Sequence, residues 1–149
     1  MEDFILYFKM GLYHVLDISA YDHILFLIVL AVVFSYHQIS KVLWLVTLFT
    51  IGHSITLALS AYGVLTLRMD LIEFLIPLTI FITGAINIVN SNETSSKKGN
   101  TNLVLALFFG LIHGLGFSNY FKMMIGQEEE KLFPLIEFAL GIEIAQITI

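Results

Sequence analysis

Long uncharged apolar stretches constrain this chain of 149 residues more than any other feature. No Asp, Glu, Lys or Arg interrupts the 26 positions between Lys41 and Arg68, and two further uncharged stretches cover 74–92 and 99–121. Runs of about 20 apolar residues match the ~30 Å hydrocarbon thickness of a bilayer. The stretches predict a polytopic membrane protein, and they exclude a soluble globular enzyme and a disordered chain.

Composition narrows the possible partners. Charged residues make up 13% of the chain, whereas a soluble domain carries about 25%. The net charge of −5 argues against nucleic acid, which needs a basic surface. Because the chain has no cysteine, disulfides, thiolate metal sites and iron–sulfur clusters are excluded. The lipid bilayer is therefore the first partner that the sequence predicts.

The expected fold is an all-α transmembrane bundle that forms a single domain over residues 1–149. Backbone groups in lipid must be satisfied internally, so each apolar segment is expected to be a helix, and no period-two alternation indicates a barrel. Polar connections are expected at His37–Lys41, Tyr62–Asp70, Ser91–Thr101 and Phe121–Lys131. The five expected spans are Ser19–Tyr36, Val42–Ala61, Leu71–Asn90, Asn102–Tyr120 and Leu132–Ile149.

The two ends of the chain differ from these spans. Phe4–Leu16 is too short to span and contains Lys9, so we expect an interfacial helix there, with re-entry into the bundle as the alternative. The chain stops at Ile149 inside an apolar run, which favours a chain truncated at its C-terminus. The loop with Lys97 and Lys98 holds the one cluster of basic residues, which favours a cytoplasmic loop and an external N-terminus.

Ionisable side chains inside the expected spans mark a candidate site, since such groups are costly at bilayer depth. His53, His113 and Glu143 each lie about 11 residues, roughly 17 Å, along their helices, which places all three near mid-bilayer. Asp22 and His23 are expected only about 5 Å deep, at the entrance of the first span. We therefore expect a polar path from Asp22 and His23 to the other three residues.

Small and polar neighbours support this convergence. Glycine, alanine or serine flanks each of the three deep groups and would let the helices approach closely. A stripe of Thr79, Thr83 and Asn87 is read as helix-packing contacts, and Thr47 and Thr50 begin a second stripe. A single buried histidine is often only an interhelical hydrogen-bond partner. The common depth of two histidines and one glutamate favours a shared site over that interpretation.

Imidazole and carboxylate ligands without thiolate suit a divalent Ni, Co or Zn ion. Because Asp22 and His23 are adjacent, their side chains diverge by about 100° on a helix, so one would ligate while the other supports it. His14 and Asp17 lie three residues apart and could form a carboxylate–histidine pair. The candidate ligands are His14, Asp22, His23, His53, His113 and Glu143, with Asp17, Ser54 and Gln146 as supporting residues.

Four stretches of the sequence resemble the HupE/UreJ family of bacterial membrane proteins. They are 21–27 (YDHILFL), 49–57 (FTIGHSITL), 109–117 (FGLIHGLGF) and 138–146 (FALGIEIAQ), and their order matches that of the family. The resemblance implies a multi-pass inner-membrane protein that is associated with hydrogenase and urease gene clusters and regarded as a nickel or cobalt permease. The family signature, a His followed by an Asp-His pair, falls on His14, Asp22 and His23.

The chain departs from the family pattern at two places. Seven residues separate His14 from Asp22, where the family has five, and Ala139 stands where the family has Asn. The family usually has a further helix after the Glu143-to-Gln146 stretch, which agrees with a truncated chain.

Three functions are compatible with these residues. The first is a metal permease in which the cation enters beside Asp22 and His23 and is held deeper in the bundle. The second is an intramembrane zinc-dependent hydrolase of peptide or lipid, in which Glu143 or Asp22 activates a metal-bound water. The third is a metal sensor or an assembly partner in a membrane complex or homo-oligomer. The resemblance favours transport and a protein that is not an enzyme.

Overall fold

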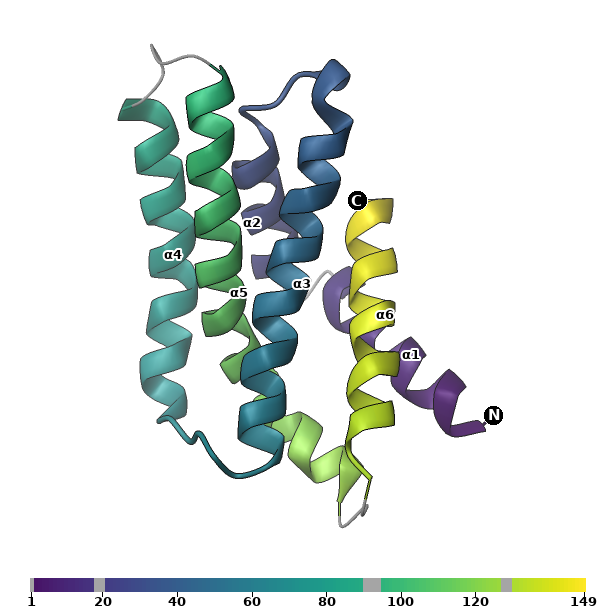
Figure 1. The fold of residues 1–149 in the computed structure, drawn as a ribbon. Coiled ribbons are helices and arrows are strands. Elements are labelled where there is room, and N and C mark those ends of the chain that lie inside the picture. Colours follow the sequence, from purple (N-terminus) through teal and green to yellow (C-terminus); the bar gives the residue numbers. More distant parts are fainter. Residues whose placement is uncertain (1, 18–20, 90–94, 127–129) are drawn as a thin grey trace.

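The computed structural model describes residues 2–17, 21–89, 95–126 and 130–149, and most of these residues are helical, with no strand among them. The all-α prediction is therefore confirmed. Six α-helices and one short 3₁₀ helix follow one another along the chain (Figure 1). They are α1 (Glu2–Leu16), α2 (Asp22–Ala31), η1 (Tyr36–Gln38), α3 (Ile39–Ala61), α4 (Met69–Val89), α5 (Ser95–Ile125) and α6 (Leu132–Thr148).

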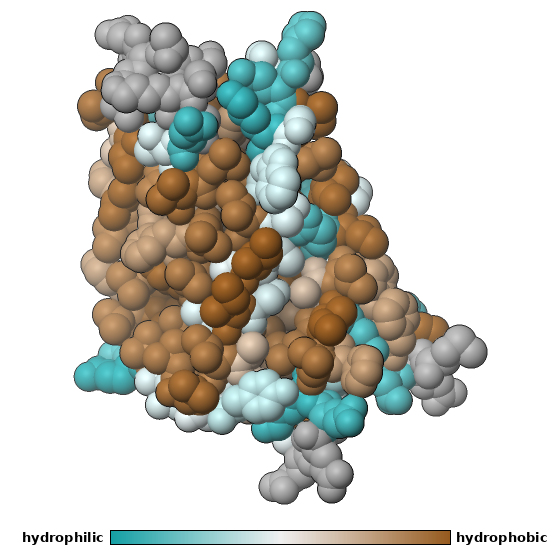
Figure 2. Space-filling view, in the orientation of Figure 1, coloured by the Kyte–Doolittle hydropathy of each residue, from teal (hydrophilic) through white to brown (hydrophobic). Residues whose placement is uncertain are grey.

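Among the described residues, three helices are long and apolar enough to cross a bilayer, namely α3, α4 and residues Asn100–Ile125 of α5. The prediction of five spans is not confirmed. The first expected span, Ser19–Tyr36, contains only the 10 residues of α2, and the fifth corresponds to the 17 residues of α6. Space-filling atoms show a broad hydrophobic face between hydrophilic ends at the top and bottom of the bundle (Figure 2).

The early end of α2 has a physical cause. The last four carbonyls of a helix have no partner within it, and inside an apolar bundle they must find one elsewhere. In α2 all four are satisfied, two by the backbone that follows and two by asparagine amides of other helices. The bonds are Val32 N to Ile28 O (3.0 Å), Asn87 Nδ2 to Val29 O (2.7 Å), Asn102 Nδ2 to Leu30 O (2.9 Å) and Phe34 N to Ala31 O (2.9 Å).

Several predicted connections are shorter than expected. The segment Phe121–Lys131 was expected to be a loop, but α5 continues to Ile125 because Phe121 and Ile125 are fully buried against α6. Likewise α5 already begins at Ser95, inside the expected loop Ser91–Thr101, of which residues 91–94 lie outside the described part of the chain.

Two closely packed helix pairs, α3 with α5 and α1 with α6, organise the bundle (Figure 1). A side chain at Gly114 would overlap the carbonyl of His53, and one at Gly52 would overlap that of Leu107. Gly11 and Gly141 play the same part between α1 and α6. Glycine thus lets both pairs approach until backbone meets backbone, as small residues do in membranes. The N-terminal helix α1 is therefore a packed member of the bundle.

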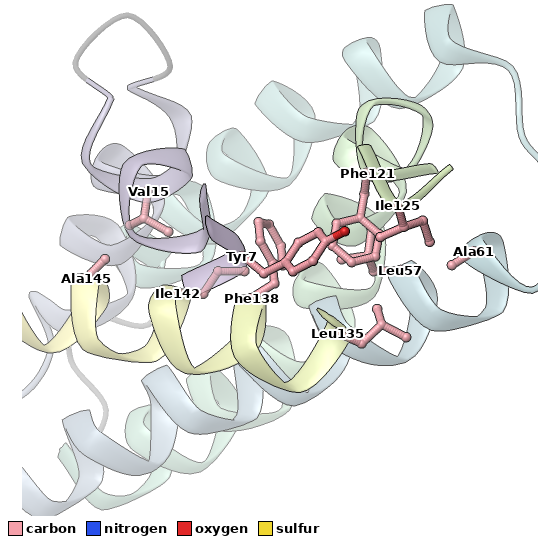
Figure 3. Packing of buried hydrophobic residues seen from close by; sticks show 10 residues of the cluster. All are labelled: Tyr7, Val15, Leu57, Ala61, Phe121, Ile125, Leu135, Phe138, Ile142 and Ala145. Carbon is pink, nitrogen blue, oxygen red and sulfur yellow. The ribbon is translucent and has the colours of Figure 1, made fainter. Parts of the chain in front are cut away.

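Two apolar cores fill the bundle, and α3 and α5 contribute to both. One core joins α1, α3, α5 and α6, where Tyr7, Phe121 and Phe138 meet (Figure 3). The other joins α2, α3 and α5 around Phe26 and Phe49. The candidate site lies between these two cores.

Candidate metal centre

Three histidines from three helices converge in the bundle. His14 lies near the end of α1, His23 in the first turn of α2 and His53 in the middle of α3. Each can offer a ring nitrogen such that the three atoms lie within 4.8 Å of one another. Among the described residues this is the one group of three or more potential ligands with such spacing. Its geometry suits a single metal ion bound by imidazole.

The three imidazole rings also pack against one another. The His14 ring lies 4.6 Å from the His23 ring and 5.5 Å from the His53 ring, measured between centroids. A fourth imidazole, His113 of α5, lies 5.5 Å from His23, measured between ring centroids. The structure thus places the predicted ligand His14 beside His23, although the spacing between His14 and Asp22 differs from the family pattern.

Two of the four rings have a fixed tautomer. The Nδ1 atom of His23 lies 3.2 Å from Oδ1 of Asp22, and Nδ1 of His113 lies 2.9 Å from the Phe109 carbonyl oxygen. Because these oxygens only accept, each Nδ1 carries the proton and donates it. The Nε2 lone pair of each ring is then available to a metal, and a bond of this kind also orients the ring.

None of the four Nε2 atoms has a hydrogen-bond partner within the described residues, and His53 lacks one at Nδ1 too. All of these atoms are buried, and the exposed fractions are 0% for His53, 2% for His113 and 3% for His23. A buried polar atom without a partner costs about 1–3 kcal/mol. His53 is therefore not the interhelical hydrogen-bond partner that a lone membrane histidine often is.

The charge state of His14 fits a metal ligand. His14 belongs to α1, which is not one of the three long apolar helices. Burial and the neighbouring imidazoles of His23 and His53 hold the pKa of His14 well below its ordinary value. The ring is thus neutral near pH 7, the form that binds metals.

Aromatic rings enclose the imidazoles, a feature that the sequence analysis did not predict. Phe117 lies 4.1 Å from His14, and Phe49 lies 5.2 Å from His113 between ring centroids. Phe26 and Phe138 complete the enclosure. Of these four phenylalanines, all except Phe138 lie three or four residues from a histidine on the same helix. This helical spacing is the sequence signal that could have predicted the aromatic enclosure.

Glu143 does not join the histidines as the depth arithmetic predicted. Its Oε1 accepts a hydrogen bond of 2.6 Å from the Thr47 hydroxyl, and Gln146 accepts one of 2.9 Å from Thr50. Phe138 is the α6 residue beside His53, with 6.2 Å between ring centroids. Glu143 lies five residues farther along α6, about 7.5 Å of helix rise. The position of Glu143 along its helix predicts its depth in the bilayer, but it does not predict the direction in which the side chain points.

The predicted supporting residues have different outcomes. Asp22 contacts His23 through its side chain and also accepts the His23 backbone N–H at 3.0 Å, so the carboxylate–histidine pair is Asp22 with His23. The predicted pairing of His14 with Asp17 stays a prediction, as does a role for Ser54. Asp17 follows α1, and its backbone N–H donates to the Tyr13 carbonyl.

A cavity of about 440 Å³ opens between α2 and α4 beside Asp22, the residue that precedes His23. Asp22 and Glu73 line it with carboxylates, and Pro77 lies on the same wall. Proline has no N–H to donate to the carbonyl four residues earlier, which here belongs to Glu73. Because Asp22 lines the cavity and contacts His23, the cavity leads from the outside of the bundle to Asp22, and through Asp22 to His23.

Comparison with known proteins agrees with this picture. No curated protein and no solved structure matches the chain. The family described as HupE / UreJ protein matches residues 1–149, the whole of the sequence. The chain belongs to the HupE/UreJ family.

Proposed function

We propose that this protein is a multi-pass inner-membrane permease for a divalent transition-metal ion of the nickel or cobalt type. Family membership supports the class, because the family is tied to nickel and cobalt handling in membranes. The observation that carries the proposal is the set of four buried Nε2 atoms without partners. A divalent cation would complete them, because the Nδ1 hydrogen bonds of His23 and His113 leave their buried Nε2 atoms without a partner.

The path begins at the cavity between α2 and α4. The carboxylates of Asp22 and Glu73 attract a hydrated cation there. His14, His23 and His53 replace part of its hydration shell, while Asp22 orients His23 and His113 lies alongside. Transport requires binding that is favourable and still reversible, and three imidazoles with remaining water satisfy that requirement. Zn²⁺ fits the same ligands, so the donor set restricts the cargo to this class of metals.

The hydrolase alternative finds no support in the geometry. It needs an acid beside a metal-bound water, but Glu143 lies about 7.5 Å of helix rise beyond Phe138, the α6 residue next to His53, and Asp22 is engaged with His23.

Uptake by proteoliposomes that contain the full chain tests the proposal. Ni²⁺ or Co²⁺ uptake is expected with the unmodified protein and is expected to be lost in His23→Ala. His37→Ala is the matched control, since His37 is exposed on η1 and distant in sequence from the site. Uptake that His23→Ala leaves unchanged would refute the proposal.

A further inference from the structure

A second group of polar side chains lies between α3 and α6 in the interior of the bundle. Thr47 and Thr50 are three residues apart on α3, and Glu143 and Gln146 are three apart on α6, so each pair shares a helix face. The Thr47 hydroxyl donates to Glu143 and the Thr50 hydroxyl donates to Gln146. We call these four residues the oxygen group.

The oxygen group is incomplete. Oε2 of Glu143 and Nε2 of Gln146 are buried and have no hydrogen-bond partner among the described residues. Gln146 is only 4% exposed, and it lines a cavity of about 110 Å³ that is otherwise apolar. No ion pair in the described part of the chain involves Glu143. A carboxylate oxygen in apolar surroundings needs a positive charge or a hydrogen bond to be tolerated.

The position of the group relates it to the histidines. Thr50 and Thr47 precede His53 by three and six residues, which is about 4.5 and 9 Å along α3. The cavity beside Asp22 lies at the first turn of α2, while the cavity beside Gln146 is lined by Leu27 and Ala31 toward the other end of α2. The two cavities thus lie toward opposite ends of α2, and Thr47 and Thr50 lie on the N-terminal side of His53 in α3.

We propose that Glu143, Gln146, Thr47 and Thr50 form a second, oxygen-donor site for a divalent cation, which receives the ion from the histidines. This inference rests on the proposed function. Carboxylate, hydroxyl and amide oxygens are harder donors than imidazole, and they hold a nickel- or cobalt-type ion less tightly. The amide oxygen of Gln146 has a second lone pair, so it can ligate while it accepts from Thr50. A weaker site next to a tighter one provides the release step that conduction requires.

Mn²⁺ is a suitable probe because it prefers oxygen ligands, and its electron paramagnetic resonance reports binding without any transport. The full chain in detergent is expected to bind one Mn²⁺ that is retained in His53→Leu and lost in Glu143→Gln. Thr47→Val, which keeps the side-chain volume, is expected to lower Mn²⁺ affinity about tenfold. Glu137→Gln is the matched control, because it makes the same change two turns earlier on α6 and is expected to keep Mn²⁺ binding.

Flux gives a second readout. In proteoliposomes, Glu143→Gln is expected to lower Ni²⁺ flux by about tenfold or more while Ni²⁺ binding by the histidines is kept. Three results would overturn the second site: no Mn²⁺ bound by the unmodified chain, Mn²⁺ retained in Glu143→Gln, or Mn²⁺ lost in His53→Leu. Failure of the permease proposal is distinguishable, because it would appear as Ni²⁺ uptake that does not depend on His23.

Discussion

The two ends of α2 treat their buried polar groups in opposite ways. At the C-terminal end, the carbonyls of residues 28–31 all have partners, two of them in asparagine amides from α4 and α5, and among the described residues only Oδ1 of Asn102 lacks one there. At the N-terminal end, His23 and the imidazoles around it keep Nε2 atoms that are buried and without partners. Both ends lie in an apolar bundle, where an unsatisfied polar group is costly.

The difference indicates what each end is for. Polar groups that hold the fold together are paired, and removal of one partner should therefore weaken the fold. Polar groups that bind a ligand are unpaired in the ligand-free protein. Their replacement by apolar side chains should affect ligand binding but not the folding of the metal-free protein. A substitution at the unpaired end should therefore abolish metal binding and keep stability. A substitution at the paired end should lower stability and keep metal binding.

The largest effect is expected for His53→Leu at the unpaired end. Ni²⁺ at roughly 100 times its Kd should stabilise the unmodified protein by about 2.7 kcal/mol, and this stabilisation should disappear in the variant. Without metal, His53→Leu should be as stable as the unmodified protein or more so, because two unsatisfied ring nitrogens are removed. Unfolding in detergent, followed by the fluorescence of Trp44, the one tryptophan, measures both quantities.

His37→Leu serves as the control for His53→Leu, since it makes the same change at an exposed position and should keep the Ni²⁺ effect. A marked loss of metal-free stability in His53→Leu would show that His53 is structural, and the contrast between the two ends of α2 would then fail.

A smaller and opposite effect is expected for Asn87→Leu at the paired end. The variant leaves the Val29 carbonyl without its amide donor, and an interhelical hydrogen bond in a membrane protein contributes about 1 kcal/mol. Metal-free stability should fall by about that amount, while the Ni²⁺ stabilisation should stay unchanged. Gly84→Ala on the same helix is the control, because its nearest contact would be Val29 Cγ1 at 3.9 Å. A changed Ni²⁺ effect in Asn87→Leu would contradict the separation of the two ends.

Local sequence properties were sufficient to predict most of the helices. Uncharged apolar stretches predicted α3, α4 and the central part of α5 because bilayer thickness sets their length. The end of α2 could not be predicted in this way, since it depends on amides that come from Asn87 and Asn102, far away in the chain. The packing of α1 on α6 also depends on a long-range contact, between Gly11 and Phe138.

The candidate metal site could be predicted only in part, because the sequence gives the depth of a residue along its helix. Depth along each helix correctly suggested that polar groups of separate segments could meet, and the structure brings His14, His23 and His53 together. Depth is only one coordinate, and the direction around the helix axis decides which neighbour a side chain meets. For that reason Glu143 faces Thr47, although its expected depth equalled that of His53. The role of the histidines as metal ligands stays a prediction.

X-ray absorption spectroscopy of Ni²⁺ bound to the purified full chain can show whether the histidines hold the ion. We expect a first coordination shell with about three imidazole nitrogens, completed by oxygen, and fewer imidazoles in His23→Ala and His53→Leu. A shell of oxygen ligands alone in the unmodified protein, or an imidazole count that neither substitution changes, would contradict the claim that these histidines converge to hold a cation.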